Sequence, residues 1–486
     1  MNDNLDQLIS RRSILRRGSC AALGLAGLSS QLLLSRTVAA ALAQTGFSDY
    51  RAMVCIFLFG GNDNGNTLIP IDGGNQGYAE YAAGRGNLAI ARAALDPTLI
   101  TPTNGAGRRF ALHPALSGVK SLFDQGNAAV VSNVGTLLAP TTKAQYFNGS
   151  VPLPTQLFAH EKQQEQWQLS RPDAVDGLGW GGRLADLLQA EGTNDNPTVS
   201  MNISVAGVSQ FLAGRTVNPY VLSPEGAPSI EAPALTGEGQ AELRRAYMDM
   251  LAAANDPNQP NRHAMAKTVN DIGERAIMNN AIVSDILAQQ SGITATPPPG
   301  NPLAAQLQTA ARLIEAGPTA LGQQRQIFFV SMGGFDNHDG LGTTDGLTGP
   351  HPGLLRQLDT ALTYFWEALG QINRRNDVTT FTASDFGRTF ASNGNGSDHG
   401  WGAHHLVMGG TQLNGGRVFG AFPNLRVDGP DDTGLGRYIP TTSVDAYGFE
   451  FARWMGVPTS EMATVFPNID RFLDVRNPAT HLGLLT

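Results

Sequence analysis

Residues 52–66 read AMVCIFLFGGNDNGN, an apolar run followed directly by glycines, asparagines and one aspartate. Eight apolar residues without polar alternation predict a β-strand that is buried on both faces, as in a parallel sheet covered by helices. The glycines predict a turn that places Asp63 just beyond the carboxyl end of this strand. In open α/β sheets, ligands bind at that edge. The stretch therefore predicts an α/β fold with polar groups gathered at one edge of its sheet.

The same apolar pattern recurs along the chain. Three further runs predict buried strands, at residues 128–134, 327–332 and 378–383. Stretches with helical periodicity predict helices, at residues 112–124, 157–169 and 355–369. Strands and helices in alternation are typical of crossover units, which build a mostly parallel sheet with helices on both faces. We therefore expect a three-layer α/β sandwich.

Residues 198–300 interrupt this alternation. Short β-rich runs come first, a mostly helical stretch follows at 235–290, and TATPPPGNP at 294–302 carries the strongest linker signal. We expect a partly helical insertion or cap here, within a single domain that spans residues 44–486. The 57 glycines and 28 prolines predict long ordered loops, which often carry function.

The first 43 residues are expected to be a twin-arginine export signal. Arg11 and Arg12 precede an uncharged stretch from Gly18 to Ser35, and Ala41-Leu42-Ala43 offers a small-residue cleavage site. A membrane anchor is the alternative, but glycines and serines interrupt a stretch that is short for the roughly 20 residues of a span. We therefore expect a periplasmic or secreted protein, exported by the twin-arginine translocase and not stably inserted in a membrane.

Net charge bears on the class of partner, and cysteine content bears on the cellular compartment. The chain has a formal net charge of −8, which argues against nucleic acid or an anionic membrane surface as a partner. Of the two cysteines, only Cys55 would remain after cleavage of the signal, and its place inside the first apolar run is typical of a small buried hydrophobic residue. Export is therefore indicated by the N-terminal signal and not by cysteine usage.

Three aspartates that follow predicted strands and two nearby histidines form a candidate metal site. They are Asp63, Asp336, His338, Asp385 and His399. Carboxylates gathered at one sheet edge repel one another unless a cation binds between them. A mixed Asp/His set suits Zn, Mn or Fe, whereas Mg or Ca fits if the histidines stay out. Five ligands allow two divalent metals, ~3.5–4 Å apart. The alternative for Asp63 alone is a turn or helix cap.

Three further candidate residues after Asp385 have alternative roles. Arg388 could hold an anionic oxygen by two hydrogen bonds, and an ion pair with one of the aspartates is the alternative. His404 and His405 come just before another apolar run. Packing or hydrogen bonding within the fold is the alternative to a role in binding metal or substrate.

Several motifs resemble the bacterial family of exported proteins known as DUF1501, a domain of unknown function. They are FLFGGNDNGNTLIP at 57–70, GWGGRLAD at 179–186, GGFDNHDG at 333–340 and SDFGRTFASNGNGSDHG at 384–400. That family is similar in turn to the alkaline phosphatase and sulfatase superfamily. The resemblance implies an alkaline-phosphatase-like fold, in which the five residues of the candidate site match metal-binding motifs.

Two departures bear on the activity that the resemblance implies. Phe386 stands where a histidine often follows the aspartate in the superfamily, and Ala159 stands where the family usually has a serine before His160. A metal-activated water could replace a serine nucleophile, with His160 as an acid/base or a further ligand.

The expected function is an exported metal-dependent hydrolase of the phosphatase or sulfatase type, acting on a small anionic ester. The alternative is a secreted binding or assembly protein that keeps the fold, meets an unknown exported partner and catalyses no reaction.

Overall fold

The computed structural model describes residues 49–486 except 74–75, 172, 174–176, 195–198, 227–236, 255–276 and 342–345. The predicted export signal at 1–43 lies outside the described residues. Within them, no helix is both long enough and apolar enough to cross a membrane.

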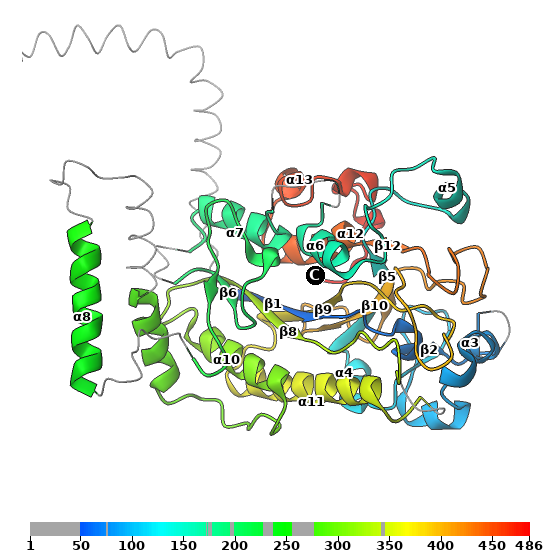
Figure 1. The fold of residues 1–486 in the computed structure, drawn as a ribbon, viewed down its shortest axis with the longest axis horizontal. Coiled ribbons are helices and arrows are strands. Elements are labelled where there is room, and N and C mark those ends of the chain that lie inside the picture. The colour runs from blue at the N-terminus through cyan, green and yellow to red at the C-terminus, as the bar shows by residue number, and fades with distance from the viewer. Residues whose placement is uncertain are drawn as a thin grey trace, which may run out of the picture.

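A nine-stranded sheet forms the centre of the molecule, in the order β11-β5-β10-β9-β1-β8-β6-β7 with β12 paired to β5 (Figure 1). Its strands are β1 (Arg51–Leu58), β5 (Ala128–Gly135), β6 (Asn202–Ser204), β7 (Tyr220–Val221), β8 (Arg325–Met332), β9 (Val378–Ser384), β10 (Ala403–Met408), β11 (Val418–Phe419) and β12 (Thr442–Ser443). Only β10 runs antiparallel to its neighbours, β5 and β9. The sheet is therefore mostly parallel, as predicted.

The three strands predicted to precede aspartates are direct neighbours, in the order β9-β1-β8. Leu58 is in register with both Met332 and Ser384, the last residues of β8 and β9. Because the three parallel strands end at the same level, the loops that follow them meet at one edge of the sheet.

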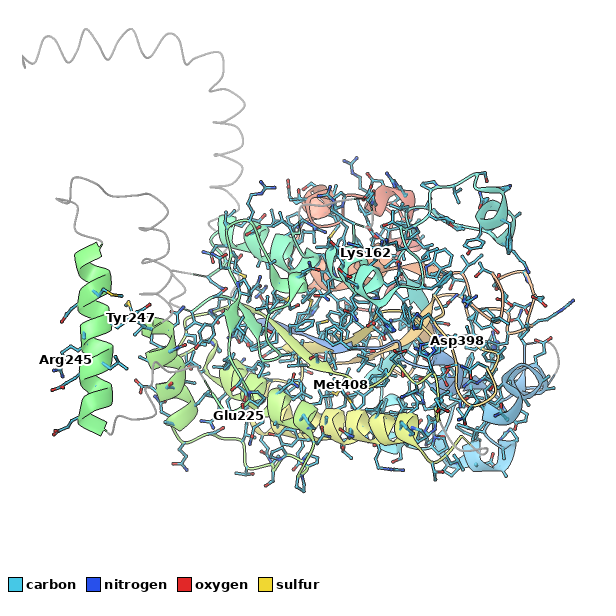
Figure 2. All side chains as sticks on the ribbon, viewed as in Figure 1. Lys162, Glu225, Arg245, Tyr247, Asp398 and Met408 are labelled. Atoms are coloured by element: carbon cyan, nitrogen blue, oxygen red, sulfur yellow. The ribbon has the colours of Figure 1, made fainter. Side chains whose placement is uncertain are left out.

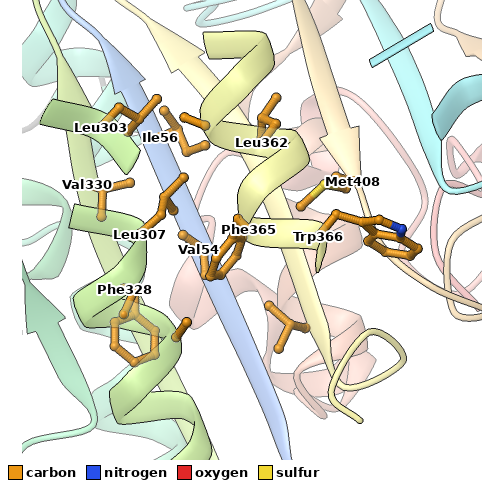
Figure 3. Close-up of a cluster of buried hydrophobic side chains, with 14 of the residues drawn as sticks. Val54, Ile56, Leu303, Leu307, Phe328, Val330, Leu362, Phe365, Trp366 and Met408 are labelled. Atoms are coloured by element: carbon orange, nitrogen blue, oxygen red, sulfur yellow. The ribbon is translucent and has the colours of Figure 1, made fainter. Parts of the chain in front are cut away.

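Helices cover one face of the sheet: α4 (Ser117–Asp124), α10 (Pro302–Ala316) and α11 (Pro350–Gln371). Figure 3 shows Leu303 and Leu307 of α10 and Phe365 of α11 facing Val54 and Phe328 of the central strands. The predicted helix at 112–124 begins only at Ser117, because Leu112 ends a short strand and residues 113–116 connect the two elements through a turn.

Further helices cover the opposite face: α6 (His160–Leu169), α7 (Trp180–Ala190), α12 (Val444–Trp454) and α13 (Met462–Val465). They enclose a second apolar cluster with the other sides of the central strands, including Cys55 and Phe381. The fold is therefore a three-layer α/β sandwich, and the strands at its centre are buried on both faces as predicted.

Smaller elements surround this sandwich. A three-stranded sheet consists of β2 (Leu68–Pro70), β4 (Phe110–Leu112) and β3 (Leu99–Ile100). Two short helices are α3 (Tyr78–Arg85) and α5 (Lys143–Asn148). Short 3-10 segments lie at Asn64–Asn66, Gly86–Leu88, Arg92–Thr98, Gln210–Leu212, Thr459–Glu461, Ile469–Arg471 and Pro478–Thr480. The small sheet and α3 pack around Tyr81 and Phe390, next to the loop that follows β9.

The segment at 198–300 differs from its predicted role as an insertion or cap. Strands β6 and β7 lie within it, yet they are hydrogen-bonded to the central sheet as the neighbours of β8. The short β-rich runs predicted at the start of this segment therefore include strands of the central sheet and not of a cap. Helix α8 (Gly237–Ala254) comes from the same segment and lies apart from the sheet in Figure 1.

Candidate metal centre

Four side chains bring potential metal-binding atoms within 4.8 Å of one another: His160, Asp336, His338 and His399. The Nε2 atoms of the three histidines lie 3.4, 3.0 and 3.5 Å from Asp336 Oδ1, in that order. Asp336 and His338 are 46% and 45% exposed. The group is therefore open to solvent on one side.

Close backbone packing at the sheet edge brings this group together. Gly60 follows β1 with φ +113°, and a Cβ there would lie 2.4 Å from the backbone N of Asp336. A Cβ on Gly396 would likewise lie 2.4 Å from the carbonyl O of His338. Only glycine permits these approaches. His160 comes from a different element, since it is the first residue of α6.

The other ring nitrogen of each histidine has a hydrogen-bond acceptor. The Nδ1 atom of His160 lies 2.7 Å from Asp385 Oδ2, and that of His338 lies 3.0 Å from Asp398 Oδ1. The Nδ1 atom of His399 lies 2.6 Å from the carbonyl O of Phe158. Because these oxygens accept, each Nδ1 donates its proton. The Nε2 lone pairs are then directed into the group, as in metal-binding histidines.

The contact between His338 and His399 indicates that the group requires a cation or an additional proton. His338 Nε2 and His399 Nε2 are 2.8 Å apart. With the proton of each neutral ring on Nδ1, two lone pairs would face each other at this distance. A cation between the rings, or an additional proton on one of them, removes the repulsion. The residues present therefore fit a bound cation.

The charges around the group keep Asp336 ionised. Burial alone would raise the pKa of Asp336, but the hydrogen bond and charge of Arg388, with smaller effects of His160 and His338, lower it overall. Burial lowers the pKa of His399, and nearby positive groups add to this effect. The hydrogen bond with Asp385 raises the pKa of His160. The group thus combines a carboxylate with imidazoles in unequal surroundings.

Asp63 does not join this group, which corrects the predicted set of five ligands. Its side chain is fully buried, and its Oδ2 accepts a hydrogen bond of 2.5 Å from Arg85 Nη2. Arg85 also donates to Asn66 Oδ1 and to the carbonyl O of Phe390. The turn after β1 directs Asp63 into the interior, where it forms a buried ion pair.

Asp385 lies beside the group but outside it. Its Oδ2 accepts from the backbone N of Gly60 at 3.2 Å, from His160 Nδ1 at 2.7 Å and from Gln164 Nε2 at 2.8 Å. Its carboxylate therefore orients His160, one layer behind the atoms that could hold a metal.

Arg388 forms the ion pair that was the alternative to substrate binding. Its side chain is fully buried, and Nη1 donates to Asp336 Oδ1 at 2.6 Å and to the carbonyl O of Gly60 at 3.1 Å. Nε lies 3.4 Å from Ser397 Oγ, and Nη2 donates to the carbonyl O of Ser397. These contacts hold Asp336 in place and leave Arg388 poorly placed to reach a substrate.

His404 and His405 are packing residues in β10. His404 Nδ1 accepts from the backbone N of Asn133 at 3.0 Å, and its ring stacks on Phe422. His405 stacks on Tyr447. Burial lowers the pKa of each histidine to about 3. Both are therefore neutral in the folded protein near pH 7.

This buried pair predicts a loss of stability in acid. In the unfolded chain both histidines bind protons near pH 6.5, and in the folded protein only near pH 3. Since the folded pKa is lowered, their stabilisation is full above pH 6.5 and falls as the pH drops toward 3. At pH 5 each is expected to cost about 2 kcal/mol, at ~1.4 kcal/mol per pKa unit. In urea unfolding, His405→Phe should lose less stability than wild type between pH 7.5 and pH 5. Equal losses would contradict this.

Phe386 and Ala159, the two departures from the family patterns, both lie close to the histidines of the group. The ring of Phe386 lies 4.7 Å from that of His160 and 4.8 Å from that of His399, between centroids. It forms an apolar wall behind the histidines. Ala159 is the N-cap residue of α6 and offers no side-chain oxygen there.

The roles of Asp398 and Arg85 were not predicted from the sequence. Asp398 directly precedes His399, and this adjacency of acid and histidine is a signal for an orienting residue, although its partner is His338. Arg85 carries no such signal, because it lies in α3 and meets Asp63 only through the fold.

Loss of Asp398 is expected to weaken metal binding without abolishing it. Asp398→Ala removes the acceptor that orients His338, and such losses cost about 10- to 100-fold in metal affinity. Competition titrations with a chelator measure this change. Asp339→Ala is the matched control, because exposed Asp339 bonds to Asn395 and not to a histidine. Equal affinities for the two variants would refute the orienting role.

Helix α8 does not cover the candidate site. Figure 2 labels Arg245 and Tyr247 of α8 at the left of the molecule and Asp398 to the right of its centre. The part of the predicted cap that α8 represents is therefore remote from the metal group.

The chain belongs to the family described as protein of unknown function (DUF1501), whose model matches residues 50–433. No curated protein matches it. Two solved structures are similar to it: Ps i-CgsB in complex with k-i-k-neocarrahexaose (11% identity, TM-score 0.33) and a structure described only as Ps i-CgsB (10% identity, TM-score 0.34). Each alignment covers 88% of this chain and 78% of the other. At such TM-scores the similarity carries no functional argument.

Proposed function

We propose that this protein is an exported metal-dependent hydrolase that acts on a phosphate or sulfate ester. The observation that carries the proposal is the orientation of the three histidines. Each donates from Nδ1 to a fixed acceptor and directs Nε2 toward Asp336 Oδ1. This is the arrangement expected of a site that holds a metal.

The ligand atoms favour some metals over others. Three imidazole nitrogens and one carboxylate oxygen suit Zn, Mn or Fe, whereas Mg and Ca prefer sites built from oxygen atoms. One metal is proposed and not two, because Asp63 and Asp385 have other partners. When bound, such a metal supplies a water that ionises near pH 7 and a positive charge that polarises an ester oxygen.

The residues of the chain have distinct roles in this proposal. His160 acts as a ligand, since its Nε2 makes no hydrogen bond and belongs to the group. Asp385 and Asp398 hold two of the rings, and Arg388 holds Asp336. Ala159 offers no hydroxyl at the start of α6, and in this proposal a metal-activated water is the attacking group.

Metal analysis and ester hydrolysis test the proposal together. Purified protein should contain one Zn, Mn or Fe per chain and should hydrolyse at least one aryl phosphate or aryl sulfate. His338→Ala should lose both properties, while His481→Ala, at a site outside the group, should keep them. A wild-type protein without stoichiometric metal, or activity that His338→Ala leaves unchanged, would sink the proposal.

One observation favours a second candidate, a secreted binding or assembly protein. Four protein ligands can complete a tetrahedral shell, as in structural zinc sites, and leave no position for water. The exposure of Asp336 and His338 favours the hydrolase instead. Stoichiometric metal without turnover of any phosphate or sulfate ester would favour the binding protein.

A further inference from the structure

A second arginine lies beside the metal group, and its terminal nitrogens are free. Arg437 Nε donates to the carbonyl O of His399 at 2.8 Å, and its guanidinium lies over the ring of Phe158, 5.1 Å from the centroid. Within the described part of the chain, its two terminal amino groups have no hydrogen-bond partner. Arg437 is only partly buried.

The two residues that the Arg437 side chain contacts, His399 and Phe158, are both part of the site. Phe158 supplies the carbonyl that accepts from His399 Nδ1, and His399 directs Nε2 into the group. The guanidinium is therefore fixed next to the backbone of one of the proposed ligands, and its two terminal nitrogens keep their hydrogen-bonding capacity for a bound molecule.

The loop around Arg437 is held rigidly to the loop that carries His399. The backbone N of Phe390 donates to the carbonyl O of Gly436, and that of Gly402 donates to the carbonyl O of Tyr438. Arg437 also exchanges backbone hydrogen bonds within its own turn, to Gly434 and from Thr433. Its position relative to His399 is thus preset before any ligand binds.

The negative charge around the group would repel an anionic ester, and Arg437 can supply a positive charge to offset it. Three carboxylates lie in or behind the group: Asp336, Asp385 and Asp398. The Arg388 guanidinium already donates hydrogen bonds to Asp336, Gly60 and Ser397. An anionic ester therefore needs a positive group besides the metal. A guanidinium with two free amino groups matches two oxygens of a tetrahedral oxyanion.

We propose that Arg437 binds the non-bridging oxygens of the phosphate or sulfate group of the substrate, and that it takes the role first expected of Arg388. This inference rests on the proposed function. It restricts the expected substrates to esters whose anionic group can contact both the metal and the two terminal amino groups of Arg437.

Anion binding by the Zn-loaded full chain tests the inference. Inorganic phosphate and inorganic sulfate are titrated separately by calorimetry into wild type, Arg437→Gln, Arg437→Lys and Arg476→Gln. Zn affinity is measured for each protein by chelator competition. Arg476 is exposed and provides a control with the same change of charge.

Arg437→Gln is expected to weaken binding of phosphate, sulfate or both by about 10- to 100-fold, as for the loss of hydrogen bonds to a charged group. Its Zn affinity should stay within about twofold of wild type, a change well below one tenfold step. Arg437→Lys should fall between, and Arg476→Gln should match wild type. The anion that loses more affinity identifies the preferred ester.

Three results would overturn the inference. They are wild type that binds neither anion, Arg437→Gln that binds both as well as wild type, and a parallel loss of Zn and anion, which would make Arg437 a support for His399. Failure of the proposed function is distinct: it would appear as Arg437-dependent anion binding without hydrolysis of any ester.

Discussion

Replacing His399 with alanine is expected to abolish stoichiometric binding of Zn or Mn at micromolar metal. The variant removes one of four ligand atoms and frees the carbonyl O of Phe158 from its partner. The loss should exceed the roughly 10- to 100-fold that follows from removing an orienting partner. Elemental analysis after gel filtration and chelator competition measure it. The hydrolase activity, where found, should disappear with the metal.

The control for His399→Ala is His481→Ala, because His481 packs on Phe449 and is not a member of the metal group. Its metal content should equal that of wild type. Circular dichroism checks that both variants remain folded. A His399→Ala protein that keeps one tightly bound metal would show that the four residues are not the ligands.

Replacing Asp63 with asparagine is expected to reduce the free energy of unfolding by about 3–5 kcal/mol, the cost of leaving a buried charge without its partner. Arg85 and Asp63 are both fully buried, so water cannot compensate for the lost charge. Urea unfolding of the purified variant measures the change. The metal content of the folded protein should stay at the wild-type level, since Asp63 lies outside the group.

Arg85→Met offers a matched test of the same ion pair. It removes the cation and leaves Asp63 buried, so it should destabilise the protein to a similar degree. If Asp63→Asn instead lost its metal without losing stability, Asp63 would be a ligand and the ion pair would not describe the working protein.

The strands and the edge at which the loops meet could be predicted from the sequence because their signals are local. Strand β1 is a continuous apolar run, β8 has an apolar centre, and β9 is rich in β-branched residues, so each strand can be recognised from its own residues. The aspartates of the loops after β8 and β9 follow from the same pattern. Strands β6 and β7, at three and two residues, are too short to leave such a pattern.

The assignment of roles within the site could not be predicted in this way. His160 meets Asp385 across 225 positions of the chain, and Arg85 meets Asp63 across 22. Arg388 and Arg437 are both arginines near the candidate histidines, and nothing in their local sequence distinguishes a paired guanidinium from a free one. Packing decides which donors find acceptors.

The sequence by itself determined a mostly parallel sheet and the edge that bears Asp336, His338, Asp385 and His399, because apolar runs and the turns after them act over a few residues. Only the tertiary structure decided that His160 joins the metal group, that Asp63 turns inward to Arg85 and that Arg437 keeps free donors. The physical reason is that hydrogen-bond and charge partners are set by which distant segments pack together.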